Sequence, residues 1–199
     1  MQLLTALSAV LILGAAAGSA FGEDEGSRAI QKGRWSIEIS LPNGGGNTLG
    51  IRKMVSARSN FGVNLGVAHD LDKRPYSPSL PGSYSFSRWD VSVQPSVKRY
   101  LSLHQNVSPY FLGAIKGEYG WLKETNAGGP PFKGFTRSAV ASLGLGVDWT
   151  PLEAISIGAY TGLNLSLSGT SQGIGTTAGT VRSDHFGTVD SGLTMNLYF

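Results

Sequence analysis

The C-terminal residues form the pattern that most restricts the fold of this chain. Four apolar side chains, Leu193, Met195, Leu197 and Phe199, alternate with the polar side chains between them. A period of two predicts a β-strand with one apolar and one polar face. Chain ends usually fray into water. A strand that ends on an aromatic side chain therefore favours an apolar face against lipid over an ordinary buried C-terminal strand.

The N-terminal residues predict a secretory leader. Residues 1–22 carry no charged side chain, and the apolar stretch from Leu3 to Ala17 is followed by small residues. An apolar segment followed by small residues at a cleavage site is typical of a signal peptide, although no Lys or Arg precedes the apolar stretch here. The stretch is shorter than the ~20 residues of a membrane-spanning helix. We expect a signal peptide over 1–22, cleaved after Ala20 or Gly22, and a periplasmic segment over 23–32.

Composition excludes several classes of protein. The chain has no Cys, so it has no disulfide and no thiolate metal site. The formal net charge of +3 is too small to indicate a nucleic-acid partner. After the leader there is no second long apolar run, which excludes a helical membrane protein. No motif for a metal or a cofactor is present, so we expect neither.

The pattern of the remaining residues predicts strands joined by turns. Alternating apolar and polar residues predict eight strands at 33–41, 47–56, 61–68, 84–101, 108–121, 135–149, 155–168 and 191–199. Three links on one side are short, Ala57–Asn60, Ser102–Val107 and Thr150–Ala154, and on the other side only the first link, Pro42–Gly46, is short. Three others, 69–83, 122–134 and 169–184, are long and rich in Gly, Pro, Ser and Thr, so we expect exposed loops there. Short and long links alternate in this way in an up-and-down membrane barrel. The pattern predicts an all-β, eight-stranded antiparallel up-and-down transmembrane β-barrel over 33–199.

The polar strand faces carry both charges and small residues, which suits a narrow barrel interior. A charge at the lipid midplane costs about 2–4 kcal/mol for Arg or Lys, so the strand charges should face inward and pair there. Lys53 does not fit, because it falls on the lipid face unless a bulge shifts the register or its chain reaches the interface. The predicted lumen charges are Arg34, Glu38, Arg88, Asp90, Lys98, Lys116, Glu118, Arg137, Asp148 and Asp190.

Aromatic residues gather near the predicted strand ends, as in the girdles of membrane proteins. The first group lies near the short links: Trp35, Phe61, Tyr100, Phe111, Trp149 and Phe199. The second group lies near the long links: Trp89, Trp121 and Phe135.

The terminal strand, the rhythm of strands and links, and the segment Asn106–Phe111 together resemble the small outer-membrane barrels of Gram-negative bacteria, the OmpA/OmpX/OmpW-like group. The resemblance implies an outer-membrane location and porin-like architecture, with lipid and lipopolysaccharide as surroundings. It also implies that the barrel assembly machinery, helped by periplasmic chaperones, recognises Leu193, Met195, Leu197 and Phe199. The chain has no match to the peptidoglycan-binding domain of two-domain members.

Three functions follow from these expectations. The first is a structural or surface-interaction role with exposed loops and a side-chain-filled lumen. The second is a small channel, or a conduit for small or apolar solutes. The third is a lipid A-modifying enzyme, which needs a His with a Ser or carboxylate partner. Of His69, His104 and His185, only His185 has such neighbours, Ser183, Asp184 and Asp190. Gly187 breaks the His-x-Ser spacing of barrel deacylases, so we expect no enzyme.

Overall fold

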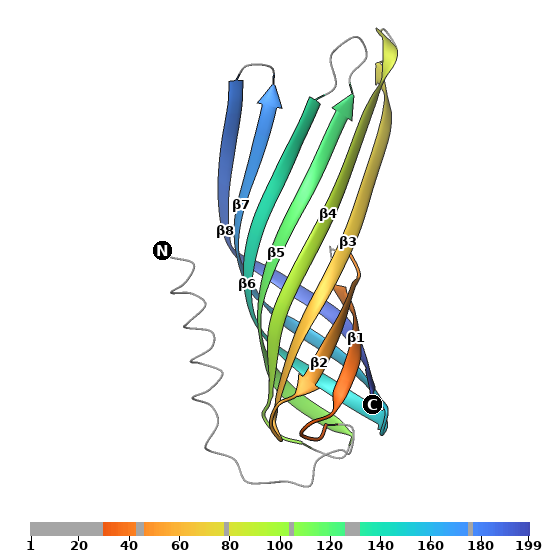
Figure 1. Ribbon diagram of the computed structural model, residues 1–199, viewed down its shortest axis with the longest axis vertical. Coiled ribbons are helices and arrows are strands. Elements are labelled where there is room, and N and C mark those ends of the chain that lie inside the picture. The colour runs from red at the N-terminus through yellow and green to blue at the C-terminus, as the bar shows by residue number, and fades with distance from the viewer. Residues whose placement is uncertain (1–29, 43–45, 78–79, 104–105, 126–131, 175–176) are drawn as a thin grey trace.

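The computed structural model describes residues 30–42, 46–77, 80–103, 106–125, 132–174 and 177–199. These residues form eight antiparallel strands in sequence order, closed into a barrel by pairing of the last strand with the first (Figure 1). The eight-stranded antiparallel fold is therefore confirmed. The predicted signal peptide lies outside the described residues. The strands are β1 (Trp35–Pro42), β2 (Thr48–Met54), β3 (Ser59–Ser77), β4 (Leu80–Tyr100), β5 (Val107–Thr125), β6 (Phe132–Leu152), β7 (Ile155–Ile174) and β8 (Thr177–Tyr198).

The strands differ greatly in length, and this difference opens one side of the barrel. β1 and β2 have 8 and 7 residues, whereas β3 to β8 have 19 to 22. β8 pairs with β1 only as far as Gly192, and β3 pairs with β2 only as far as Gly66. Beyond these points β3 to β8 continue as a sheet that rises above the short β1–β2 pair (Figure 1).

The prediction of long loops at 69–83, 122–134 and 169–184 is wrong for most of these residues, which belong to strands β3 to β8. The β3–β4 ladder continues from His69↔Trp89 to Pro75↔Ser83, and β7 and β8 pair as far as Ile174↔Thr177. The Gly, Pro and Ser residues there indicate turns, and the sequence of these segments has no regular apolar alternation that would indicate a strand. Pro75 lies at a register irregularity, where its missing N–H costs the ladder little. The connections between β2 and β3, β4 and β5, and β6 and β7 are short, as predicted, although β3 begins at Ser59 and β6 extends to Leu152, inside two of the predicted links.

The two faces of the barrel have opposite chemistry. The inward positions of the lower barrel are buried and mostly polar, whereas the outward positions are exposed and apolar. A barrel in water has the reverse arrangement, with its apolar face inside. No helix among the described residues is long and apolar enough to cross a membrane. The exposed apolar residues include Ile37, Leu49, Ile51, Leu65, Val67, Val91, Val93, Leu143, Leu145, Leu163, Leu193 and Leu197.

Small residues allow the strands to approach closely inside the barrel. Gly144 and Gly162 lie directly opposite each other on β6 and β7. A Cβ atom on either glycine would overlap the backbone of the facing strand. Glycine is therefore required at both positions for the sheet to curve this tightly.

Exposed aromatic side chains lie near both ends of the apolar surface, with one correction to the prediction. Trp35, Phe61, Phe111, Trp149 and Phe199 are exposed near the short links. Tyr100 was assigned to the same girdle but is buried inside the barrel, because it follows Lys98 on the inward face of β4. On the other side, register pairs His69↔Trp89, Trp89↔Trp121 and Trp121↔Phe135 form a row across β3 to β6, which we call the aromatic row.

An apolar cluster closes the end of the barrel near the short links. Ile30, Met54, Leu103 and Tyr198 are buried there around Tyr100 and Tyr110. Ile30 belongs to the segment predicted to precede the barrel, and it packs into this cluster.

Candidate functional site

The lower lumen is crossed by four buried charges, which we call the ion cluster: Glu38, Arg52, Lys98 and Asp148. Arg52 Nη1 lies 3.0 Å from Glu38 Oε1, and Lys98 Nζ lies 3.0 Å from Glu38 Oε2. Lys98 Nζ also lies 3.6 Å from Asp148 Oδ1. The four residues come from β1, β2, β4 and β6. The cluster therefore spans the barrel interior.

Neutral side chains add hydrogen bonds to the ion cluster. Arg52 Nε donates to Asn60 Oδ1 at 2.7 Å, and Arg52 Nη1 donates to Ser96 Oγ at 2.9 Å. Asn64 Nδ2 donates to Glu38 Oε1 at 2.8 Å. The Tyr100 hydroxyl donates to Asp148 Oδ2 at 2.7 Å. Each of the four charges thus has an opposite charge nearby, and three of the four have a neutral hydrogen-bond partner as well.

The ion cluster is balanced, with two cations and two anions, and this balance is what makes its burial tolerable. A charge removed from water costs several kcal/mol unless opposite charges and hydrogen bonds compensate it. The side chains of Arg52, Lys98 and Asp148 are almost wholly inaccessible to solvent. The cluster therefore closes the lumen at this level.

A second group of charges lies farther up, where the barrel opens. It comprises Arg88 and Asp90 on β4 with Lys116 and Glu118 on β5, and we call it the cup cluster. Arg88 Nε lies 2.7 Å from Asp90 Oδ2, and Arg88 Nη2 lies 3.5 Å from Glu118 Oε1. Lys116 Nζ lies 2.6 Å from Glu118 Oε2.

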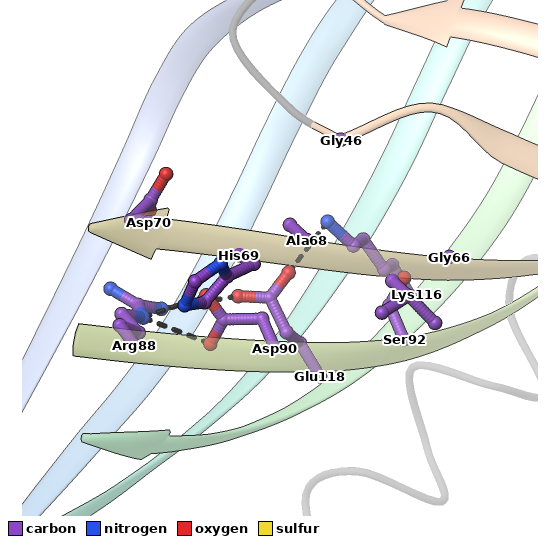
Figure 2. A pocket seen from close by; sticks show the side chains of 11 residues that line it. Gly46, Gly66, Ala68, His69, Asp70, Arg88, Asp90, Ser92, Lys116 and Glu118 are labelled. Carbon is purple, nitrogen blue, oxygen red and sulfur yellow. Dashed lines mark hydrogen bonds and ion pairs between the residues drawn. The ribbon is translucent and has the colours of Figure 1, made fainter. Parts of the chain in front are cut away.

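The cup cluster lines an open cavity of about 640 Å³. Figure 2 shows its four side chains joined by ion pairs beside β3 and β4. Gly46 and Gly66 border the cavity where β1 and β2 end, so it lies beside the open side of the barrel. The cavity is therefore a polar cup above the closed part of the lumen.

Most of the predicted lumen charges face inward, divided between these two groups. Asp190 also faces inward, on the side of β8 that carries buried Thr194 and Asn196. Arg34 precedes β1, and its Nη1 donates to the Glu153 carbonyl at 3.1 Å. Arg34 thus lies by the short links rather than within the lumen.

Arg137 does not face the lumen as predicted. On β6 the inward positions are those of Asp148, Ser142 and every second residue between and beyond them, so Arg137 lies on the outer face. It is exposed, and its guanidinium lies 5.4 Å from the centroid of the Phe135 ring. An outward arginine is tolerated here because its long chain carries the charge toward an aromatic ring.

Lys53 lies on the outer face with no shift of register. It pairs with Trp35 on one side and Phe61 on the other. Its Nζ atom lies 4.8 Å from the centroid of the Trp35 ring. The ammonium group is therefore held at the aromatic girdle beside the short links.

Arg52 is the main site residue that the sequence analysis missed. The signal was present, because Arg52 follows Ile51 in a predicted strand and so takes the polar face. Tyr110, whose ring lies 4.8 Å from Lys98 Nζ, was missed as well.

The histidines give no catalytic arrangement in the described structure. His69 is exposed, stacks on Trp89 with ring centroids 4.2 Å apart, and lies 3.3 Å from Ser87 Oγ. His104 lies outside the described residues. For His185 the structure gives the strand register, in which it pairs with Ser166. Among the described residues, no group of three His, Asp or Glu is placed to hold a metal.

The apolar residues of the terminal strand point outward. Leu193, Met195, Leu197 and Phe199 are all exposed. Phe199 N donates to the Trp35 carbonyl at 3.0 Å, and Trp35 N donates to the Phe199 carbonyl at 3.3 Å. The terminal residue thus takes part in the seam that closes the barrel.

Comparison with known proteins supports the fold. No family model and no curated protein matches the sequence. Among solved structures, a major outer membrane protein from Thermus thermophilus aligns with a TM-score of 0.51 and 13% identity. That alignment covers 85% of this chain and 100% of the Thermus chain. At this identity the likeness shows a shared eight-stranded barrel and nothing further.

Two other barrels align with lower scores. The N-terminal β-barrel domain of Pseudomonas aeruginosa OprF has a TM-score of 0.44 and 13% identity, over 84% of this chain and 98% of that one. The attachment invasion locus protein Ail of Yersinia pestis has a TM-score of 0.37 and 12% identity, over 85% and 100%.

Proposed function

We propose that this chain is an integral outer-membrane barrel that closes its own lumen and serves as a surface-interaction protein. The observation that carries the proposal is the combination of an exposed apolar outer face with a buried ion cluster inside. Contact between an apolar surface and water is unfavourable, so an exposed apolar outer face is stabilised when it is buried in lipid. The polar interior then needs internal pairing, which the ion cluster supplies.

The surface role follows from what lies above the closed lumen. The cup cluster and its cavity are open, and the strands continue beyond the closed part of the barrel. Charges of both signs line the cup, namely the four of the cup cluster and Asp70, which suits a polar partner with donor and acceptor groups. The same polarity disfavours a conduit for apolar compounds.

Because the lumen is closed, we predict that the protein does not conduct ions across a membrane. We expect planar-bilayer recordings of the purified barrel to show no stable, large conductance, because the ion cluster fills the lumen. A double variant, Lys98→Ala with Tyr110→Ala, removes two large inward side chains and should raise the conductance. A stable open pore in the unaltered protein would favour the channel function instead.

We propose further that a signal peptide directs the chain to the periplasm and that the barrel assembly machinery recognises the outward residues of β8. Replacement of Phe199 with Ser should slow insertion, because the strand loses its terminal apolar side chain, and precursor should accumulate in the periplasm. Pulse–chase fractionation measures this, with Phe61→Ser as the control for loss of another exposed aromatic. Equal insertion rates for both variants would contradict this role of Phe199.

We propose no enzymatic activity for the barrel. The ring of His69 stacks on Trp89 and its Nε2 lies 3.3 Å from Ser87 Oγ, and among the described residues no carboxylate hydrogen bond to this ring is present. If His185→Ala changed lipid A acylation in cells, the enzyme function would replace the one proposed.

A further inference from the structure

The outer surface of β5 and β6 carries two lysines directly opposite each other. Lys123 pairs with Lys133 in the register, and both are exposed. Like charges at directly opposed positions of a sheet repel each other. The flanking partners are Ser87 on β4 and Gly173 on β7, which bring no charge. This pairing indicates a surface that is stabilised when an anion lies between the two ammonium groups.

Arg137 adds a third cation to the same surface. It lies on β6 on the far side of Phe135 from Lys133, and its guanidinium lies over the Phe135 ring at 5.4 Å. Phe135 pairs with Trp121, which lies two positions before Lys123 on β5. The three cations Lys123, Lys133 and Arg137 therefore surround one aromatic pair, and we call them the basic patch.

The cations of the basic patch differ from those of the cup cluster. Arg88 and Lys116 both pair with Glu118. In the part of the chain that the structure describes, no ion pair joins a cation of the basic patch to an acidic side chain. Their donors are therefore available to an external anion.

The position of the basic patch identifies the class of anion. It borders the aromatic row, and Trp and Tyr rings gather where lipid headgroups meet the hydrocarbon core. The patch lies on the side of the barrel away from the short links, which face the periplasm in a membrane barrel of this type. In the outer membrane that we propose for this barrel, the lipid at that surface is lipid A, whose phosphates lie at headgroup level.

We propose that Lys123, Lys133 and Arg137 bind the phosphate groups of lipid A. The arginine fork donates two parallel hydrogen bonds to a phosphate, and the lysines add compact positive charge. The inference rests on the proposed outer-membrane location. It goes beyond that location because it assigns a specific lipid site to one part of the barrel surface.

The test measures lipid A binding by the full barrel folded in zwitterionic detergent micelles. Tryptophan fluorescence follows titration with bis-phosphorylated lipid A, with phosphate-free lipid A and with inorganic phosphate. We expect Lys123→Gln, Lys133→Gln and Arg137→Gln each to weaken binding of bis-phosphorylated lipid A about fivefold. The matched control is Lys53→Gln, because Lys53 also lies beside an aromatic ring but at the opposite end of the barrel. It should bind like the unaltered protein.

The results separate this inference from the proposed function. Phosphate-free lipid A should bind weakly to every variant, and inorganic phosphate alone should not compete at matched concentration. Equal binding by the unaltered protein and a variant that carries all three Gln substitutions would overturn the basic patch, as would an equal loss in Lys53→Gln. Failure of the unaltered protein to insert into phosphatidylcholine vesicles would overturn the proposed function and this inference with it. Insertion without any preference for phosphorylated lipid A would overturn the inference alone.

Discussion

Replacement of Glu38 with alanine should lower the free energy of unfolding by about 3–5 kcal/mol, because it leaves buried cations without their shared partner. Glu38 contacts both Arg52 and Lys98 at 3.0 Å, and its side chain is 3% exposed. Without it, Asp148 alone would oppose two buried positive charges. Urea unfolding of the folded barrel in lipid vesicles measures the loss.

Glu118 is the matched control for this experiment. It also contacts one arginine and one lysine, Arg88 and Lys116, but its side chain is 21% exposed. Water screens such a pair, so Glu118→Ala should cost less than about 1 kcal/mol. A double variant, Glu38→Gln with Lys98→Met, removes one charge of each sign and should be more stable than Glu38→Ala. Equal small losses for Glu38→Ala and Glu118→Ala would contradict the buried cluster.

Replacement of Leu143 with arginine should cost about 2–4 kcal/mol, although the side chain is exposed. Leu143 is 54% exposed on the outer face of β6 and pairs with Leu163 on β7. In a water-soluble protein an exposed substitution of this kind changes stability by only about 0.5 kcal/mol. In lipid the guanidinium must lose its hydration or distort the bilayer. Unfolding in vesicles therefore distinguishes the two surroundings.

Thr125 is the control position for the arginine substitution. It is exposed near the end of β5, beyond the aromatic row, where it pairs with Ser85. An arginine there lies in water or among headgroups, so Thr125→Arg should cost about 0–1 kcal/mol. If Leu143→Arg cost no more than Thr125→Arg, the outer face of β6 would not be in lipid.

Alternation along the chain predicted the fold because every strand in the closed barrel has one apolar and one polar face. Ile37 and Glu38, or Val147 and Asp148, illustrate how one step along the chain exchanges lipid-facing and lumen-facing positions. The prediction for Arg137 is wrong because its charge indicates the lumen, whereas its place in the period of two indicates the outer face. Applied strictly from Asp148, the period places Arg137 outside.

The upper strands and the ion cluster could not be predicted from the sequence, for two different reasons. Residues 69–83 contain Pro, Ser and charged residues in no regular apolar alternation, so the sequence there does not distinguish strand from loop. Contacts within the ion cluster join distant parts of the chain, such as Glu38 with Lys98. Sequence patterning gives the face of such a residue, but not its height in the barrel or its partner across the lumen.

The central claim is that the apolar face of this barrel lies outward in a membrane, and heat modifiability on SDS gels tests it most directly. The outer-membrane fraction is run with and without boiling. A closed barrel that faces lipid should stay folded in SDS until heated, so its band should shift on boiling. A protein found in the soluble periplasm, with the same mobility in both lanes, would contradict the account. The apolar residues would then have to form the core of a secreted, lipocalin-like binding protein.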